Sequence, residues 1–144
     1  MGKKSLIDVT EPRFQIPSNH DVMAFVRQAN PFAHSDVGSV LLALGKGIPG
    51  AYADCPSYAS PAYVVLHTDQ TQIFAIAFGQ RGLAFRLAGA AHAAALADGG
   101  KRAPEVGQAW IRFDLWELNA SAGARERLRH WCVRALSDAV LGAS

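Results

Sequence analysis

The chain has 144 residues, of which 50% are hydrophobic and 18% are charged, and its mean hydropathy is +0.08. A chain of this length buries enough surface to fold as one domain without a metal ion or a disulfide. The composition therefore excludes a large multidomain enzyme, a collagen-like repeat and a disordered chain. The charged fraction lies below the roughly 25% that is typical of globular proteins, which leaves apolar surface for a partner subunit or a ligand.

The net charge of +2 comes from 14 basic and 12 acidic residues. The whole excess lies in residues 118–144, which hold four arginines against two acidic residues. Any electrostatic attraction for an anionic partner is therefore small and belongs to this last segment.

The cysteine pattern and the N-terminal residues indicate a reduced, cytoplasmic protein. Cys55 and Cys132 are far apart and form no CxxC motif, so neither a zinc ribbon nor a thioredoxin-type site is predicted. Lys3 and Lys4 are followed by too short an apolar run for a secretory signal. No apolar stretch reaches the roughly 18 residues that a membrane-spanning helix needs, so we expect no membrane partner.

Residues 1–17 contain two prolines and show no periodicity, which predicts a flexible N-terminal tail before a single domain at 18–144. The spacing of Val22, Phe25 and Val26 predicts a helix over residues 19–30, ended by Asn30-Pro31.

Residues 35–44 are rich in Val and Leu and fit a buried strand or a short helix equally well. Residues 45–61 combine glycines, prolines and small residues, which predicts a long loop, and loops of this length are often functional. The loop begins with a formal GxGxxG match at Gly45–Gly50. Cys55-Pro56 and Pro61 follow, and they exclude the helix that a dinucleotide site needs.

Three apolar runs separated by tight turns predict consecutive antiparallel strands at 62–68, 72–79 and 82–87. In the last of these, Leu83, Phe85 and Leu87 alternate with Ala84 and Arg86. Because strand side chains alternate between the two faces, Arg86 is expected to point away from the core.

An alanine-rich run at 89–99, stopped by Gly99-Gly100, predicts a helix. Residues 109–117 alternate as a fourth strand, and residues 121–141 carry a helical apolar stripe that includes Leu128, Trp131 and Val140. The order β-β-β-α-β-α from residue 62 predicts an α+β fold. We expect an antiparallel sheet of about four strands with helices on one face and an N-terminal helix.

No catalytic motif is present, so no enzymatic activity and no catalytic residue are predicted. The five histidines show neither an HxxxH nor an HExxH pairing, and no metal or other cofactor is expected. Walker A and GxSxG motifs are absent too.

A basic and aromatic set surrounds the predicted sheet and suits phosphate contact with base stacking. Its members are Arg81, Arg86, Lys101, Arg102, Trp110, Arg112 and Trp116. The alternative is that Arg86 and Arg112 pair with Asp114 or Glu117 on a solvated sheet face, with the tryptophans partly buried under a helix.

Four short runs carry a family resemblance: Pro61-Ala62-Tyr63 entering a strand, Ile73-Phe74-Ala75 after a hairpin turn, Gly82–Leu87, and Trp110-Ile111-Arg112-Phe113 before the closing helix. With the alanine-rich helix, they give the region from Pro56 to Val140 an element order that resembles the YjbR/MmcQ-like family of bacterial proteins. The region is also similar to the related N-terminal domain of TfoX-type proteins. The resemblance implies an α+β fold with a proposed DNA-binding role, outward Arg86, Trp110 and Arg112, and no catalytic residues.

Three functions are therefore expected as alternatives. The first is weak binding of nucleic acid or another anionic ligand through Arg81, Arg86, Lys101, Arg102, Trp110 and Arg112. The second is a protein-interaction or homodimer module that uses the apolar surplus with Trp116 or Trp131. The third is a small-molecule pocket beside the 45–61 loop, lined by Tyr52, Tyr58, Phe74 and Trp110.

Overall fold

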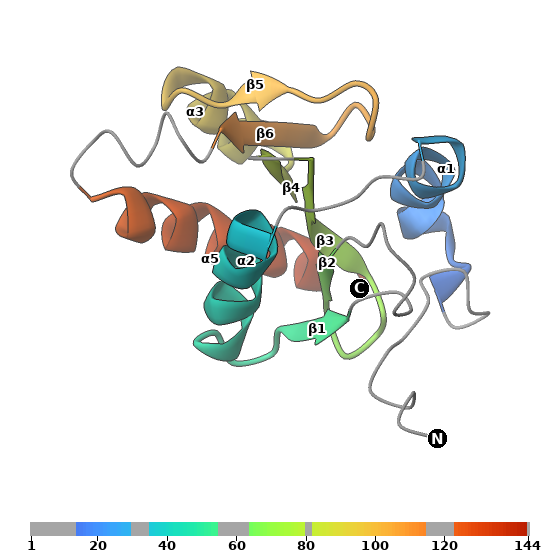
Figure 1. Ribbon diagram of the computed structural model, residues 1–144. Coiled ribbons are helices and arrows are strands. Elements are labelled where there is room, and N and C mark those ends of the chain that lie inside the picture. The colour runs from blue at the N-terminus through green and yellow to red at the C-terminus, as the bar shows by residue number, and fades with distance from the viewer. Residues whose placement is uncertain (1–13, 30–34, 55–63, 80–81, 115–122, 144) are drawn as a thin grey trace.

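The computed structural model describes residues 14–29, 35–54, 64–79, 82–114 and 123–143 (Figure 1). Within these ranges the chain forms four α-helices, one 3-10 helix and six strands. In chain order they are η3 (Pro17–Asn19), α1 (His20–Ala29), α2 (Ser35–Lys46), β1 (Tyr52–Asp54), β2 (Val64–His67), β3 (Ile73–Phe78), β4 (Gly82–Arg86), α3 (Gly89–Ala97), β5 (Lys101–Arg102), β6 (Trp110–Asp114) and α5 (Ala124–Ala143).

The six strands form one antiparallel sheet in the order β1-β2-β3-β4-β6-β5. The predicted α+β class is confirmed, and the four predicted strands correspond to β2, β3, β4 and β6. The predicted count of about four strands is too low, because β1 and β5 add one strand to each edge. β1 has three residues and β5 has two, which is too short for an alternating pattern to show in the sequence.

Helices cover both faces of the sheet (Figure 1). Side chains of α2, α3 and α5 pack against one face, together with Phe85 and Phe113, in what we call the first core. Side chains of α1 pack against the other face, together with Ile76 and Trp110, in the second core. The inner strands β2, β3 and β4 are therefore buried on both sides, which explains why β3 is a nearly continuous apolar run and not an alternating one.

One extra residue in β3 sets which side chains enter each core. Leu66 pairs with Ala75 but the next residue, His67, pairs with Ile73, so Phe74 has no partner of its own across the ladder. This β-bulge places Ile73 in the second core and both Phe74 and Ala75 in the first.

The segment at 35–44, which the sequence leaves open between strand and helix, belongs to α2. Its buried residues Val37, Leu41 and Leu44 recur at the spacing of one helix face. Gly45 lets the end of α2 approach the sheet, because a Cβ atom there would lie 2.7 Å from a methyl group of Leu66.

Residues 14–17, which the sequence assigns to a flexible tail over residues 1–17, belong to the described structure. Phe14 is fully buried in the second core and meets the ring of His67 edge-on, with centroids 5.1 Å apart. The sequence of this segment shows no helical or strand periodicity, but burial of the large Phe14 ring stabilises its position against the sheet. Residues 1–13 lie outside the described ranges.

The predicted apolar stripe of α5 is confirmed over most of its length. Its buried members are Leu128, Trp131, Cys132, Ala135, Leu136 and Ala139. Val140 was expected in this stripe but is 52% exposed. In the described part of the chain, no helix is both long and apolar enough to cross a bilayer.

Candidate functional site

The sheet register brings three of the predicted cations to one face. β4 and β6 pair Arg86 with Trp110 and Ala84 with Arg112, and β5 pairs Lys101 with the same Arg112. Because side chains alternate along a strand, Arg86, Arg112 and Lys101 all lie on the face of the second core.

The other two predicted cations do not join them. Arg102 pairs with Ile111, a first-core residue, so Arg102 lies on the opposite face of the sheet. Arg81 lies outside the described residues, as do Trp116 and Glu117. The described cations of the predicted basic set are therefore divided between the two faces of the sheet.

Trp110 does not point outward, although the resemblance implied that it would, with Arg86 and Arg112. Its side chain is 1% exposed and packs in the second core near Val106 and Ala103. The expectation of an exposed Trp110 is wrong. Strand alternation places Trp110 on the second face of the sheet, and α1 packs against that face. A ring with so little exposed surface does not provide a stacking platform for a nucleobase.

Arg86 is the predicted residue with the most distinctive surroundings. It is half-buried at the end of β4, and one guanidinium nitrogen, Nη1, donates a 2.8 Å hydrogen bond to the backbone oxygen of Ser18. Among the described residues no carboxylate lies within ion-pair distance of it. A guanidinium has five N–H donors, so most of its donor capacity is unused by the protein.

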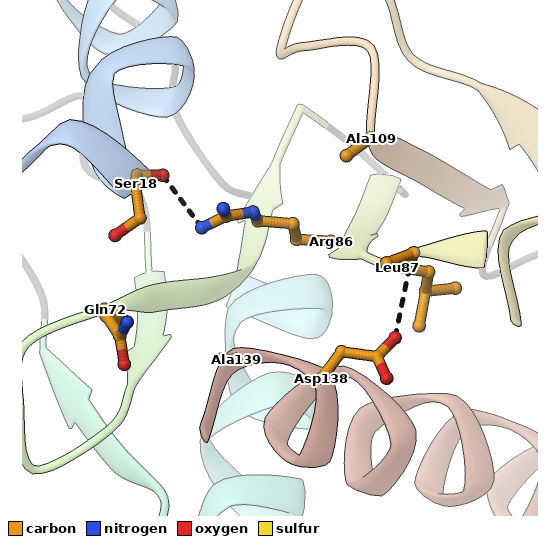
Figure 2. A pocket seen from close by; sticks show the side chains of 8 residues that line it. Ser18, Gln72, Arg86, Leu87, Ala109, Asp138 and Ala139 are labelled. Atoms are coloured by element: carbon orange, nitrogen blue, oxygen red, sulfur yellow. Dashed lines mark hydrogen bonds between the residues drawn. The ribbon is translucent and has the colours of Figure 1, made fainter. Parts of the chain in front are cut away.

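The guanidinium of Arg86 faces a pocket of about 200 Å³ (Figure 2). Five parts of the chain form its walls: Ser18 of η3, Gln72 before β3, the end of β4 with the residues that join it to α3, Ala109 before β6, and α5. These parts are far apart in sequence, so no local motif marks the pocket.

Asp138 of α5 also lines this pocket and is held by two contacts. Its Oδ2 accepts a 3.1 Å hydrogen bond from the backbone N–H of Ala88, the N-cap residue of α3, which has no capping side chain of its own. Its Oδ1 lies 3.4 Å from Nε of Arg134, one helical turn away. Asp138 thus serves α3 as a cap supplied by another helix.

Gln72 contributes an amide to the same pocket. Its Oε1 accepts a hydrogen bond of 3.3 Å from the hydroxyl of Thr68. Within the described structure its amide nitrogen makes no hydrogen bond, and no fully buried side-chain nitrogen or oxygen atom there is left unpaired. The Gln72 amide nitrogen is therefore a donor that the described residues leave unused.

The structure does not bring together the residues that were predicted to line a pocket beside the 45–61 loop. Phe74 packs in the first core and Trp110 in the second, so the sheet separates them. Tyr52 is half-exposed on β1, and Tyr58 lies outside the described residues.

Two other hollows are shallower. A groove of about 400 Å³ between α1 and residues 104–108 carries Asp21 and Glu105, whose charges disfavour an anion. A groove of about 580 Å³ runs along the outer side of α5 over Arg129, His130 and Val133.

The described residues supply neither a clear nucleophile nor a metal site. Cys132 is fully buried, and burial raises its pKa to about 12 although the charge of Arg129 opposes this shift. Over the same residues there is no group of three or more potential metal ligands. Cys55 lies outside them.

Comparison of the chain with protein-family models, with curated proteins and with solved structures finds no match. The function therefore has to be argued from the pocket itself. Of its charged residues, strand alternation singled out Arg86, whereas Asp138 was only counted among the charges of residues 118–144.

Proposed function

We propose that this protein binds a small anionic ligand in the pocket at Arg86. The observation that carries the proposal is a half-buried guanidinium that faces a pocket and has no acidic partner among the described residues. Partial burial strengthens its attraction for an anion, because fewer water molecules compete and the local dielectric constant is lower than in bulk water.

The size of the pocket favours a small ligand. A volume of about 200 Å³ is below the roughly 300–1,000 Å³ of sites for drug-sized molecules. A carboxylate or a phosphate fits the geometry of a guanidinium, which donates two parallel hydrogen bonds to such groups.

Nucleic acid is less well supported than a small anion. Trp110 is buried, Arg102 and Arg86 lie on opposite faces of the sheet, and Arg86 faces a pocket. The DNA-binding role implied by the resemblance to the YjbR/MmcQ-like family stays a prediction.

The test is a calorimetric titration with propionate, butyrate and inorganic phosphate at low ionic strength. Arg86→Gln should weaken binding of the preferred anion by about tenfold or more, because hydrogen bonds to charged groups contribute about 1.5–3 kcal/mol. Arg86→Lys keeps the charge but loses the paired donors, so its affinity for the anion should lie between those of wild type and Arg86→Gln. The matched control is Arg112→Gln, which removes a half-buried arginine on the same face but outside the pocket.

Equal affinity of wild type and Arg86→Gln for every anion would overturn the proposal. A fluorescence-anisotropy titration with labelled duplex and single-stranded DNA at two salt concentrations tests the alternative, which is nucleic-acid binding. Binding that weakens steeply with salt, and that Arg112→Gln impairs as much as Arg86→Gln does, would favour nucleic acid over the pocket.

A further inference from the structure

Two opposite charges line the Arg86 pocket without neutralising each other. Arg86 enters from β4 and Asp138 from α5, and both line the same pocket. In Figure 2 the Arg86 side chain extends towards Ser18, and the Asp138 carboxylate is directed to the backbone beside Leu87. The ion pair formed by Asp138 is with Arg134, and Arg86 donates to a backbone oxygen. An unpaired positive group and a carboxylate thus lie in the walls of one small cavity.

Both groups are held in place by contacts that leave binding capacity free. The carbonyl of Ser18 uses one of five donors of Arg86. The Ala88 N–H and Arg134 use two of about four lone-pair positions of Asp138. Side chains fixed in this way lose little entropy when a ligand arrives.

The remaining walls restrict what lies between the two charges. Leu87, Ala88, Ala109 and Ala139 give an apolar lining, so the ligand needs a short carbon skeleton there. Gln72 adds one neutral amide near the charges. A simple anion would satisfy Arg86 but would be repelled by Asp138, whereas a ligand with a second, positive group would satisfy both.

We propose that the ligand is a small zwitterion, an amino acid whose carboxylate binds Arg86 and whose ammonium group binds Asp138. This inference rests on the proposed function, since it takes Arg86 as the anion-binding group. It adds that Asp138 selects for an amine, and that the distance between the amine and the carboxylate is matched to the pocket.

The test compares each simple acid with its amino derivative on the full chain by calorimetry. The probe pairs are propionate with L-alanine and with 3-aminopropanoate, butyrate with 4-aminobutyrate, and valerate with 5-aminopentanoate. In at least one pair the amino acid should bind about tenfold more tightly, because it adds one charge-assisted hydrogen bond.

Two variants isolate the contribution of Asp138. Asp138→Asn keeps an oxygen for the Ala88 N–H but removes the charge, so it should abolish the preference for the amino acid while the simple acid binds at least as well. Arg134→Gln leaves the α3 cap untouched and removes the competing cation, so it should raise that preference by a few-fold. This second variant decides the question if Asp138→Asn does not fold.

The outcomes separate this inference from the proposed function. If simple acids bind as tightly as their amino derivatives in every pair, or if neither Asp138→Asn nor Arg134→Gln changes the preference, the zwitterion is overturned while the anion site stands. If no probe binds the wild type at millimolar concentration, or if Arg86→Gln changes nothing, both are overturned.

Discussion

Asn19 joins the N-terminal segment to the residues that lead into β3 through one fully buried side chain. Its Nδ2 donates to the backbone oxygens of Phe14 and Thr71, at 2.9 and 2.8 Å, and its Oδ1 accepts from the N–H of Ile73 at 2.9 Å. The side chain thus satisfies backbone groups that no strand or helix pairs.

Asn19→Ala should lower the free energy of unfolding by about 2–4 kcal/mol, because backbone groups near the second core lose their partners. Urea unfolding followed by tryptophan fluorescence measures the loss. The control is Ser39→Ala, an exposed polar residue of α2, which should change stability by less than about 0.5 kcal/mol. A loss below about 1 kcal/mol for Asn19→Ala would contradict the role assigned to it.

Asp98 has a lowered pKa although partial burial opposes the shift. Hydrogen bonds from Trp131 and Arg127, and the charges of Arg127 and His130, outweigh the loss of solvation. The folded protein therefore holds a proton on Asp98 less readily than the unfolded chain does. The stabilisation is complete above the unfolded pKa of about 4 and is lost as the pH falls through the lower, folded pKa.

Asp98→Asn should therefore be less stable than wild type near neutral pH, by an amount that shrinks as the pH falls below about 4. Urea midpoints at a series of pH values measure the difference. Trp131→Phe, which removes one donor to the carboxylate, should reduce the same pH dependence in part. If Asp98→Asn lost the same amount of stability relative to wild type in acid as at neutral pH, this account would be contradicted.

At the scale of elements, the C-terminus of α3 shows how a turn places a strand. Gly99 has a φ of +100°, and the N–H groups of Gly99 and Gly100 donate to the carbonyls of Leu96 and Ala95 in a Schellman arrangement. The chain then enters β5 one residue later. A Cβ atom at Gly100 would lie 2.5 Å from Ile111 Cγ2 and 2.9 Å from the oxygen of Ala95.

Gly100→Ala should destabilise the protein by about 1–3 kcal/mol, because a backbone oxygen and a core side chain both block the new methyl group. Thermal unfolding measures the change. Gly47→Ala is the matched control, since its nearest neighbours would be at 3.8 Å, an ordinary contact distance. Equal melting temperatures for the two variants would contradict the close packing at Gly100.

At the scale of the whole molecule, two cores share one sheet, and the pocket lies where the N-terminal segment, β4 and α5 meet. Cys132 is buried in the first core with a pKa of about 12. At pH 8 only about one thiol in ten thousand is ionised at that pKa, and access is blocked in addition. Its reaction with a thiol reagent therefore requires opening of the first core.

In a Cys55→Ser background, labelling of Cys132 should be slow in water. Its rate should rise with urea in step with the unfolding of the whole domain, since the first core spans most of the sheet. Mass spectrometry of the labelled chain measures this rate beside the fluorescence transition. Rapid labelling under conditions where fluorescence stays native would mean that α5 detaches alone.

Much of the element order follows from the sequence by itself. Periodicity at 3.6 residues predicted α1 and the buried face of α5. Apolar runs between tight turns predicted β2, β3 and β4, and an alternating pattern predicted β6. These signals are local, because each arises from residues within one helix or strand. The pair Gly99-Gly100 marked the end of α3 for the same reason.

Only the tertiary structure decided the rest. The edge strands β1 and β5 exist because neighbouring strands offer them hydrogen bonds, and Trp110 is buried because α1 crosses its face. Strand alternation could place Arg86 outside the first core. It could not bring Asp138, Gln72 and Ser18 to the same pocket, because those residues come from segments that meet only after the sheet and both cores have formed.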